Sequence, residues 1–200
     1  MTQEVVIAPG LWMPAAAMAL LALHLKRAGY APRVFAYRGR SPMEGNIERF
    51  TRFVAGPAHF IGHSLGGVLL LDALNRHRDL PVASVLLIGS PVRGCLAGRR
   101  FGDGQVGRWL MGACGSLWEE RPARWQREAP LGVIAGTLAL GLGRVLYKLP
   151  GVNDGVVCLE ETEVDGMADR ATVPLGHSML ITSGKVASLA QQFFATGKFQ

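Results

Sequence analysis

Short runs of apolar residues alternate with longer amphipathic segments along most of the chain. Six runs have the apolar character, and the glycine or proline nearby, that are typical of buried parallel strands. These expected strands are Glu4–Ala8, Arg33–Tyr37, Ala58–Ile61, Val82–Ile88, Leu131–Gly136 and Thr172–Pro174. The segments with the length and the apolar stripe of a helix are 14–27, 47–55, 67–75 and 178–194. This alternation predicts an α/β fold in which helices cover both faces of a parallel sheet.

The alternation stops between Val92 and Ala129. This stretch has no strand-like run, but it holds three tryptophans and seven arginines against four acidic residues, a local net charge of 7 − 4 = +3. We expect an insertion of one or two short helices over one edge of the sheet. It is a candidate lid whose apolar side binds an acyl chain and whose arginines contact anionic lipid headgroups. The alternative is a layer that fills the face of the sheet and leaves its arginines in solvent.

Length and composition fit a single domain, residues 1–200. The 200 residues are 49% apolar and 18% charged, with a formal net charge of +6. In some proteins a positive charge of this size binds nucleic acid or an anionic membrane surface, and in others it has no such role. The aromatic residues are not interleaved with the basic ones, so we expect no nucleic-acid partner. A peripheral contact with an anionic membrane stays open.

The cysteines and the apolar N-terminal segment decide the expected compartment. Cys95, Cys114 and Cys158 are far apart and show neither metal-ligand spacing nor a disulfide framework. The uncharged segment 5–25 is interrupted by prolines, and no small-residue cleavage site follows it. We therefore expect a cytoplasmic protein without an export signal or a spanning helix, located peripherally at the inner membrane if it binds one. The glycine-rich segment 137–143 is too short to span, and we expect a buried loop there.

The third expected strand leads into Gly62-His63-Ser64-Leu65-Gly66-Gly67, a G-x-S-x-G pattern that precedes a helix. A strand, a sharp turn and a helix form the context in which this pattern exposes a nucleophilic serine. The glycines let the two backbones approach each other, and unpaired amides at the helix N-terminus favour a developing negative charge. A glycine-rich turn that contains a serine by chance is the alternative. The context favours Ser64 as a nucleophile.

A serine nucleophile needs an imidazole to accept its proton and a carboxylate to orient that imidazole. In such a sheet the order is serine, acid, histidine, each beyond the carboxyl end of a strand. His177 follows a late strand, whereas the other histidines lie in helices, in a strand or beside the serine: His24, His59, His63 and His77. Asp154 follows the strand that ends at Gly136 and is the expected acid. Its competitors are Asp72, on the helix after Ser64, and Asp165 and Asp169, expected at the amino end of the final strand.

The oxyanion formed by attack of Ser64 needs two preorganised N–H donors. The turn after Ser64 offers the amide of Leu65, and the turn after the first strand offers the amide of Leu11. Trp12 is the second choice for the latter donor, although plain packing is the more ordinary role for its side chain. We expect an oxyanion hole formed by Leu11 and Leu65.

Four segments together resemble the α/β-hydrolase superfamily and are most similar to its small bacterial lipase and esterase members. They are Ala-Pro-Gly-Leu-Trp at 8–12, Gly-His-Ser-Leu-Gly-Gly at 62–67, Asn-Asp-Gly-Val-Val at 153–157 and Gly-His-Ser-Met-Leu at 176–180. The resemblance covers nearly the whole chain. It implies a minimal α/β-hydrolase with a helical cap or lid at about 92–129, and a triad of Ser64, Asp154 and His177. It departs at Pro9-Gly10, where the family commonly has His-Gly.

The resemblance implies hydrolysis of carboxylic esters, with lipid or acyl esters as the expected substrates, through an acyl-enzyme. A thioesterase or an acyltransferase would use the same triad, and the fold alone does not separate these activities. A binding protein that keeps the fold without turnover is a third hypothesis, although no triad position is substituted. Nothing in the sequence calls for a metal ion or a cofactor.

Overall fold

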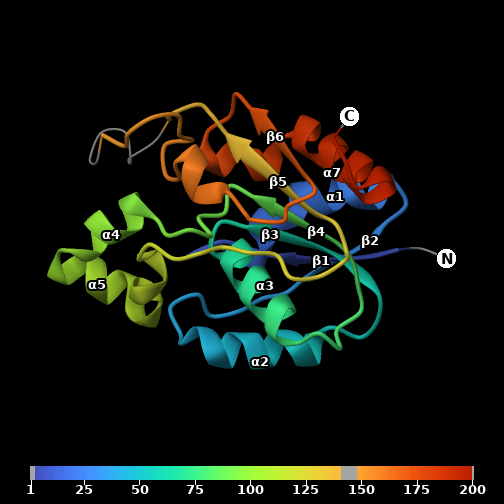
Figure 1. The fold of residues 1–200 in the computed structure, drawn as a ribbon, viewed down its shortest axis with the longest axis horizontal. Helices are drawn as coiled ribbons and strands as arrows, with labels where there is room; N and C mark the ends of the chain where they lie inside the picture. The colour runs from blue at the N-terminus through green and yellow to red at the C-terminus, as the bar shows by residue number, and fades with distance from the viewer. Residues whose placement is uncertain (1–2, 141–147, 200) are drawn as a thin grey trace.

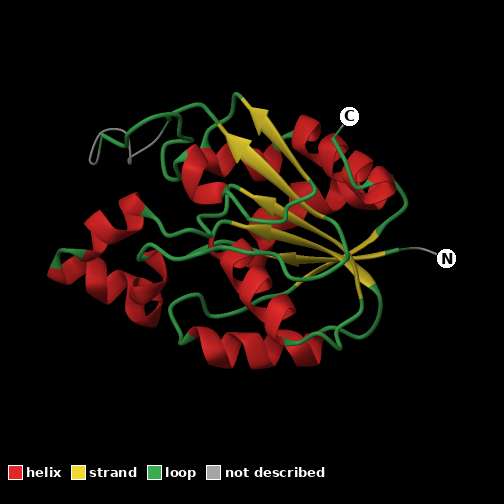
Figure 2. Cartoon of the chain, viewed as in Figure 1, coloured by secondary structure: helices red, strands yellow, loops and turns green. Residues whose placement is uncertain are grey.

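A six-stranded parallel sheet forms the centre of the computed structural model, which describes residues 3–140 and 148–199 (Figures 1 and 2). The strand order is β2-β1-β3-β4-β5-β6, and all five neighbouring pairs are parallel. The strands are β1 (Glu4–Ala8), β2 (Ala31–Val34), β3 (Ala58–His63), β4 (Val82–Ile88), β5 (Leu131–Gly136) and β6 (Asp169–Val173). The predicted bounds of β1, β4 and β5 are confirmed.

Helices cover both faces of this sheet, as the alternating pattern predicts (Figure 1). The helix α1 (Ala19–Arg27), preceded by the 3₁₀ turn η1 (Ala15–Met18), and α7 (Gly184–Thr196) lie on one face, and α2 (Met43–Phe53) and α3 (Leu65–Arg76) lie on the other. Alternate residues of β1 supply the two apolar layers, because neighbouring side chains of a strand point to opposite faces. Val5 and Ile7 belong to one cluster, and Val6 and Ala8 belong to the other.

The second strand differs from the prediction, since it ends at Val34 and not at Tyr37. Val34 pairs with Ile7, and the amide of Phe35 still donates to the carbonyl oxygen of Ile7. The next position of the neighbouring strand beyond Ala8 is Pro9, which has no N–H to continue the ladder. The Tyr37 hydroxyl instead donates to the carbonyl oxygen of Pro9, at 2.8 Å.

Helix boundaries account for most of the remaining differences. α2 spans Met43–Phe53, about one turn earlier than the predicted 47–55, because it starts directly after Pro42, which has non-helical dihedral angles of φ −51° and ψ 137°. The single C-terminal helix predicted at 178–194 is wrong. Residues His177–Thr182 form the 3₁₀ turn η4, and α7 begins at Gly184 after Ser183, whose Oγ accepts a hydrogen bond from the amide of Val186. A serine cap of this kind starts a new helix.

The segment predicted as a buried loop at 137–143 is also different. Leu138 and Leu140 are 39% and 49% exposed, because they lie beyond the carboxyl end of β5 and outside both apolar layers. Positions 141–143 lie outside the described residues. Within 3–140 and 148–199, no helix combines the length and apolar character needed to cross a membrane.

The insertion, residues 92–129, contains two short helices and a 3₁₀ turn: α4 (Leu96–Gly102), α5 (Gln105–Met111) and η2 (Gly112–Trp118). They lie beyond the carboxyl ends of the strands, so the edge that they cover is the carboxyl edge of the sheet (Figure 1). Trp118 and Trp125 are buried, whereas Trp109 is 68% exposed. Several of its arginines bind the main body: Arg121 pairs with Asp72, and Arg127 donates to the carbonyl oxygen of Leu80.

Candidate active site

Ser64 occupies the turn between β3 and α3 in a strained backbone conformation, with φ 53° and ψ −125°. Positive φ is costly for a residue with a Cβ, and such outliers concentrate at functional sites. The glycines around Ser64 permit the turn by close approach of backbones. A Cβ at Gly66 would overlap the carbonyl oxygen of Ala8, and a Cβ at Gly67 would overlap the Ser90 side chain. The local sequence therefore holds Ser64 at the N-terminus of α3.

His177 and Asp154 form a buried pair at the same edge of the sheet. His177 Nδ1 lies 2.7 Å from Asp154 Oδ2, and Asp154 is 1% exposed. The other carboxylate oxygen, Oδ1, accepts hydrogen bonds from the amides of Val156 and Val157, at 2.9 and 2.7 Å. A carboxylate with these donors acts as an acceptor, so it fixes the proton of His177 on Nδ1 and leaves Nε2 able to accept a proton.

Gly89, at the end of β4, shows how closely this pair packs on the sheet. A Cβ at Gly89 would lie 3.3 Å from both Asp154 Oδ2 and His177 Nδ1.

Ser64 and His177 line one cavity. No hydrogen bond of Ser64 Oγ occurs within the described parts of the chain. Catalytic contacts of this type often tighten only when substrate binds. The structure thus brings Ser64, Asp154 and His177 to one edge from three different strand ends.

The segments that carry the two expected oxyanion donors, Leu11 and Leu65, adjoin Ser64. Leu65 is the first residue of α3, so its amide has no partner within the helix. A Cβ at Gly10 would lie 3.0 Å from Ser64 Cβ, which places the loop that carries Leu11 against the serine. Trp12 has φ 58°, and its indole N–H donates to the carbonyl oxygen of Leu110, at 3.1 Å. Trp12 therefore contacts the insertion through its side chain.

The competing histidines and carboxylates do not line the cavity that contains Ser64. His59 Nδ1 lies 2.7 Å from Ser84 Oγ within the sheet. Asp72 pairs with Arg121 and Asp165 pairs with Arg93, while Asp169 begins β6 at its amino end. These residues have structural partners elsewhere.

The cavity has a volume of about 300 Å³ and an apolar lining. The main body supplies Leu11, Trp12, Pro91, Val156 and Val157, and the insertion supplies Cys95, Ala97, Gly98, Phe101, Met111 and Trp118. An apolar cavity with a few polar groups at one place is typical of a small-molecule site. The sequence pointed to the insertion as a whole but carried no signal for its individual lining residues.

His63, which the sequence places beside Ser64, contacts the site in a way that the sequence does not indicate. Its side chain is buried, and its Nδ1 has no hydrogen-bond partner in the described structure. Burial, and secondarily the charge of His177, lowers the pKa of His63 to about 3. His63 is therefore neutral at any pH at which His177 takes up a proton from Ser64.

The three cysteines are buried free thiols. Burial raises the pKa of Cys95 to about 12, so the thiol in the cavity wall is protonated at neutral pH and is no nucleophile. Among residues 3–140 and 148–199, no three His, Cys, Asp or Glu side chains are grouped to hold a metal ion.

No family model and no curated protein matches the chain, so the comparison with known proteins rests on solved structures. Lipase BlEst2 from Bacillus licheniformis in propeptide form is 15% identical, with a TM-score of 0.76 over 96% of this chain. The match covers 50% of the lipase, so the chain spans half its length. A pyrethroid hydrolase from Sphingobium faniae JZ-2 is 13% identical over 98% of both chains, with a TM-score of 0.65.

A third structure is MGS-MChE2, an α/β-hydrolase from the metagenome of lagoon sediments at Mar Chica, Morocco. It is 14% identical over 98% of this chain and 91% of the other, with a TM-score of 0.68. The chain has the α/β-hydrolase fold. The fold class predicted from the four sequence segments is therefore confirmed. In an α/β-hydrolase fold, function resides in the site rather than in the scaffold, so the site is what supports a proposed activity.

Proposed function

We propose that this α/β-hydrolase-fold protein is a serine hydrolase that cleaves carboxylic esters through an acyl-enzyme. The observation that carries the proposal is the Asp154–His177 pair, which is buried and oriented beside the strained Ser64 in one apolar cavity. This arrangement has the three parts that activate a serine: a nucleophile, a base and an acid that orients the base. Two of the similar structures are a lipase and a pyrethroid hydrolase, and they add support for ester substrates.

The mechanism begins with attack of Ser64 Oγ on the acyl carbonyl carbon. His177 Nε2 takes the serine proton, and Asp154 stabilises the resulting imidazolium through its contact with Nδ1. The amides of Leu11 and Leu65 bind the oxyanion. The tetrahedral intermediate then expels the alcohol, which receives the proton from His177. Water repeats the sequence on the acyl-enzyme, releasing the carboxylic acid and restoring Ser64.

A thioesterase or an acyltransferase would use the same residues and differ in the leaving group or in the attacking group. A non-catalytic binding protein would keep the cavity but not turn over. We place ester hydrolysis first, because the apolar lining of the cavity contains no charged side chain that would recognise a larger polar leaving group. Lipid or acyl esters are the substrate class that this lining suits.

A substrate panel tests this proposal. Purified protein is assayed with paired oxygen esters and thioesters of the same acyl group, with and without an added alcohol acceptor. We expect hydrolysis of the oxygen esters, and a loss of kcat on the order of 10⁶ for Ser64→Ala. Ser188→Ala, an exposed serine on α7, is the matched control and keeps full activity. Turnover of thioesters alone, or transfer to the alcohol without hydrolysis, would assign the protein to one of the alternatives.

We further propose a cytoplasmic protein that contacts an anionic membrane surface through arginines of the insertion, such as Arg99 and Arg108. Each basic side chain near such a surface contributes on the order of 1 kcal/mol. Sedimentation with vesicles of phosphatidylcholine, with or without phosphatidylglycerol, tests this contact. Binding to the anionic vesicles that weakens in Arg99→Gln/Arg108→Gln supports it, and equal binding to both vesicle types contradicts it.

A further inference from the structure

The cavity that contains Ser64 is bounded inside the insertion by a buried pair of side chains. Trp118 and Met111 are 5% and 2% exposed, and the indole N–H of Trp118 points to Met111 Sδ at 2.9 Å. By contrast, Trp12, which lines the same cavity, is 57% exposed and packs edge-to-face on Phe101. The cavity therefore has an open side at Trp12 and an inner wall at Met111 and Trp118.

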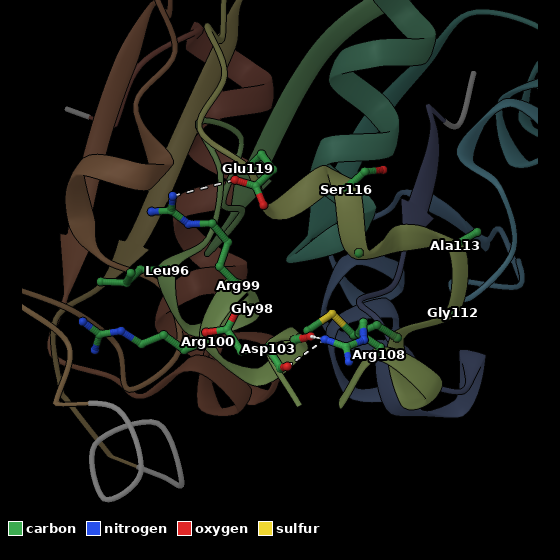
Figure 3. Close-up of a pocket in the computed structure, with 13 residues that line it drawn as sticks. Leu96, Gly98, Arg99, Arg100, Asp103, Arg108, Gly112, Ala113, Ser116 and Glu119 are labelled. Atoms are coloured by element: carbon green, nitrogen blue, oxygen red, sulfur yellow. Dashed lines mark hydrogen bonds and ion pairs between the residues drawn. The ribbon is translucent and has the colours of Figure 1, made fainter. Parts of the chain in front are cut away.

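A second, larger hollow lies behind this wall. It has a volume of about 790 Å³ and is lined by residues of α4, α5 and η2 (Figure 3). Gly98 and Met111 line both spaces, so the two spaces adjoin at these residues. Trp118 rests directly on Gly98, since a Cβ at that position would lie 2.8 Å from the indole Cγ. Small changes at Met111 can therefore connect the two spaces.

The two spaces differ in polarity. The cavity at Ser64 has apolar walls, whereas charged side chains project around the hollow, namely Arg99, Arg100, Asp103, Arg108 and Glu119 (Figure 3). Arg99 Nε is buried and has no partner in the described parts of the chain. An acyl chain that entered the hollow would therefore place methylene groups against charged groups that need hydration. The wall marks the point at which chain burial stops being favourable.

We propose that Met111 and Trp118 form the end of the acyl-binding pocket and restrict the substrate to acyl chains of medium length. This inference rests on the proposed ester hydrolysis. With roughly 30 Å³ for each small group, a volume of 300 Å³ holds on the order of ten heavy atoms. Each methylene buried in this pocket raises kcat/KM about fourfold, up to the length at which the chain meets Met111.

The test is the dependence of kcat/KM on acyl length, measured with one leaving group on saturated esters from acetyl to palmitoyl. For the wild type we expect a rise to a medium-length optimum and a fall of at least about tenfold for palmitoyl. Met111→Ala removes side-chain volume from the inner wall, which lengthens the pocket and moves the optimum to longer chains. Met111→Phe fills the pocket and moves the optimum to shorter chains. Opposite shifts cannot both arise from loss of folding.

Trp109→Ala is the matched control, because this tryptophan of α5 is exposed and lines neither space. It leaves the length profile unchanged. An identical profile for the wild type and both Met111 variants overturns the inference, as does a wild-type optimum at acetyl or palmitoyl esters. If the folded wild type hydrolyses no ester of any length, the proposed function fails, and this inference fails with it. Hydrolysis with an unshifted optimum removes only the length-determining role of Met111 and Trp118.

Discussion

The imidazole of His63 packs against the imidazole of His177, with ring centroids 4.8 Å apart. His63 Nε2 also lies 3.3 Å from the carbonyl oxygen of His177. A carbonyl oxygen only accepts, so this contact places the proton of neutral His63 on Nε2. His63 Nδ1 faces the loop after β1, where a Cβ at Gly10 would lie 3.2 Å away. His63 thus connects the segment that carries the base to the loop that carries Leu11.

This contact makes His63 a positioning residue. His63→Leu removes the donor to the His177 carbonyl oxygen, and we expect kcat to fall about a hundredfold, because small misplacements of a base have effects of that size. KM stays unchanged, because His63 does not line the substrate cavity. His63→Gln, whose amide nitrogen can replace Nε2, restores most of kcat. Steady-state kinetics of the three proteins test this, and a parallel loss in both variants, or a rise of KM alone, would contradict it.

The depressed pKa of His63 predicts how stability depends on pH. The pKa is about 3 in the folded protein, below the ordinary value of 6.5, so the unfolded chain binds the additional proton between these pH values. The free energy of unfolding therefore falls as the pH falls from 6.5 toward 3, and this contribution is absent in His63→Gln. The wild type loses about 1.4 kcal/mol more per pH unit than the variant in this window. Urea unfolding at several pH values measures the difference, and parallel pH dependences would refute the assignment.

Among the carboxylates of residues 3–140 and 148–199, Asp154 stands out in having three N–H donors within hydrogen-bond distance. In Asp154→Asn, the new side chain has one oxygen and one NH₂ group in place of two oxygens. If the oxygen keeps the backbone amides of Val156 and Val157, the NH₂ group faces His177 Nδ1, so the proton of His177 is no longer fixed on Nδ1. We expect kcat to fall on the order of 10⁴. Asp165→Asn is the control, because Asp165 pairs with Arg93 at the amino end of β6. Wild-type kcat in Asp154→Asn would exclude Asp154 as the acid.

The sequence predicts those parts of the fold that depend on local signals. The bounds of β1, β4 and β5 follow from apolar runs that end at glycine or proline. Ser64, Asp154 and His177 are predicted as site residues because each follows the end of a strand, where a parallel sheet collects its functional residues. The division of the C-terminal helix at Ser183 also had a local signal, the serine cap before Gly184, which the uniform apolar stripe of residues 178–194 obscured.

Other parts of the site depend on contacts between segments far apart along the chain. His63 and His177 are separated by 114 residues, and only the sheet order brings them together. Glu161 accepts hydrogen bonds from the amides of Leu96 and Cys158, at 2.6 and 2.8 Å, and so fixes the start of α4 to the loop after Asp154. The inner wall at Met111 and Trp118 depends on packing of seven-residue helices that have too few turns for a periodic signal.

Intact-mass analysis after exposure to a fluorophosphonate probe shows whether Ser64 is an activated nucleophile. The probe transfers its phosphonyl group to a serine that a neighbouring base has activated. We expect one adduct on the wild type, none on Ser64→Ala and one on Ser188→Ala. Labelling of wild type should also be lost in His177→Ala. A folded wild type that stays unmodified, or an adduct that persists in Ser64→Ala, would show that Ser64 is not an activated nucleophile.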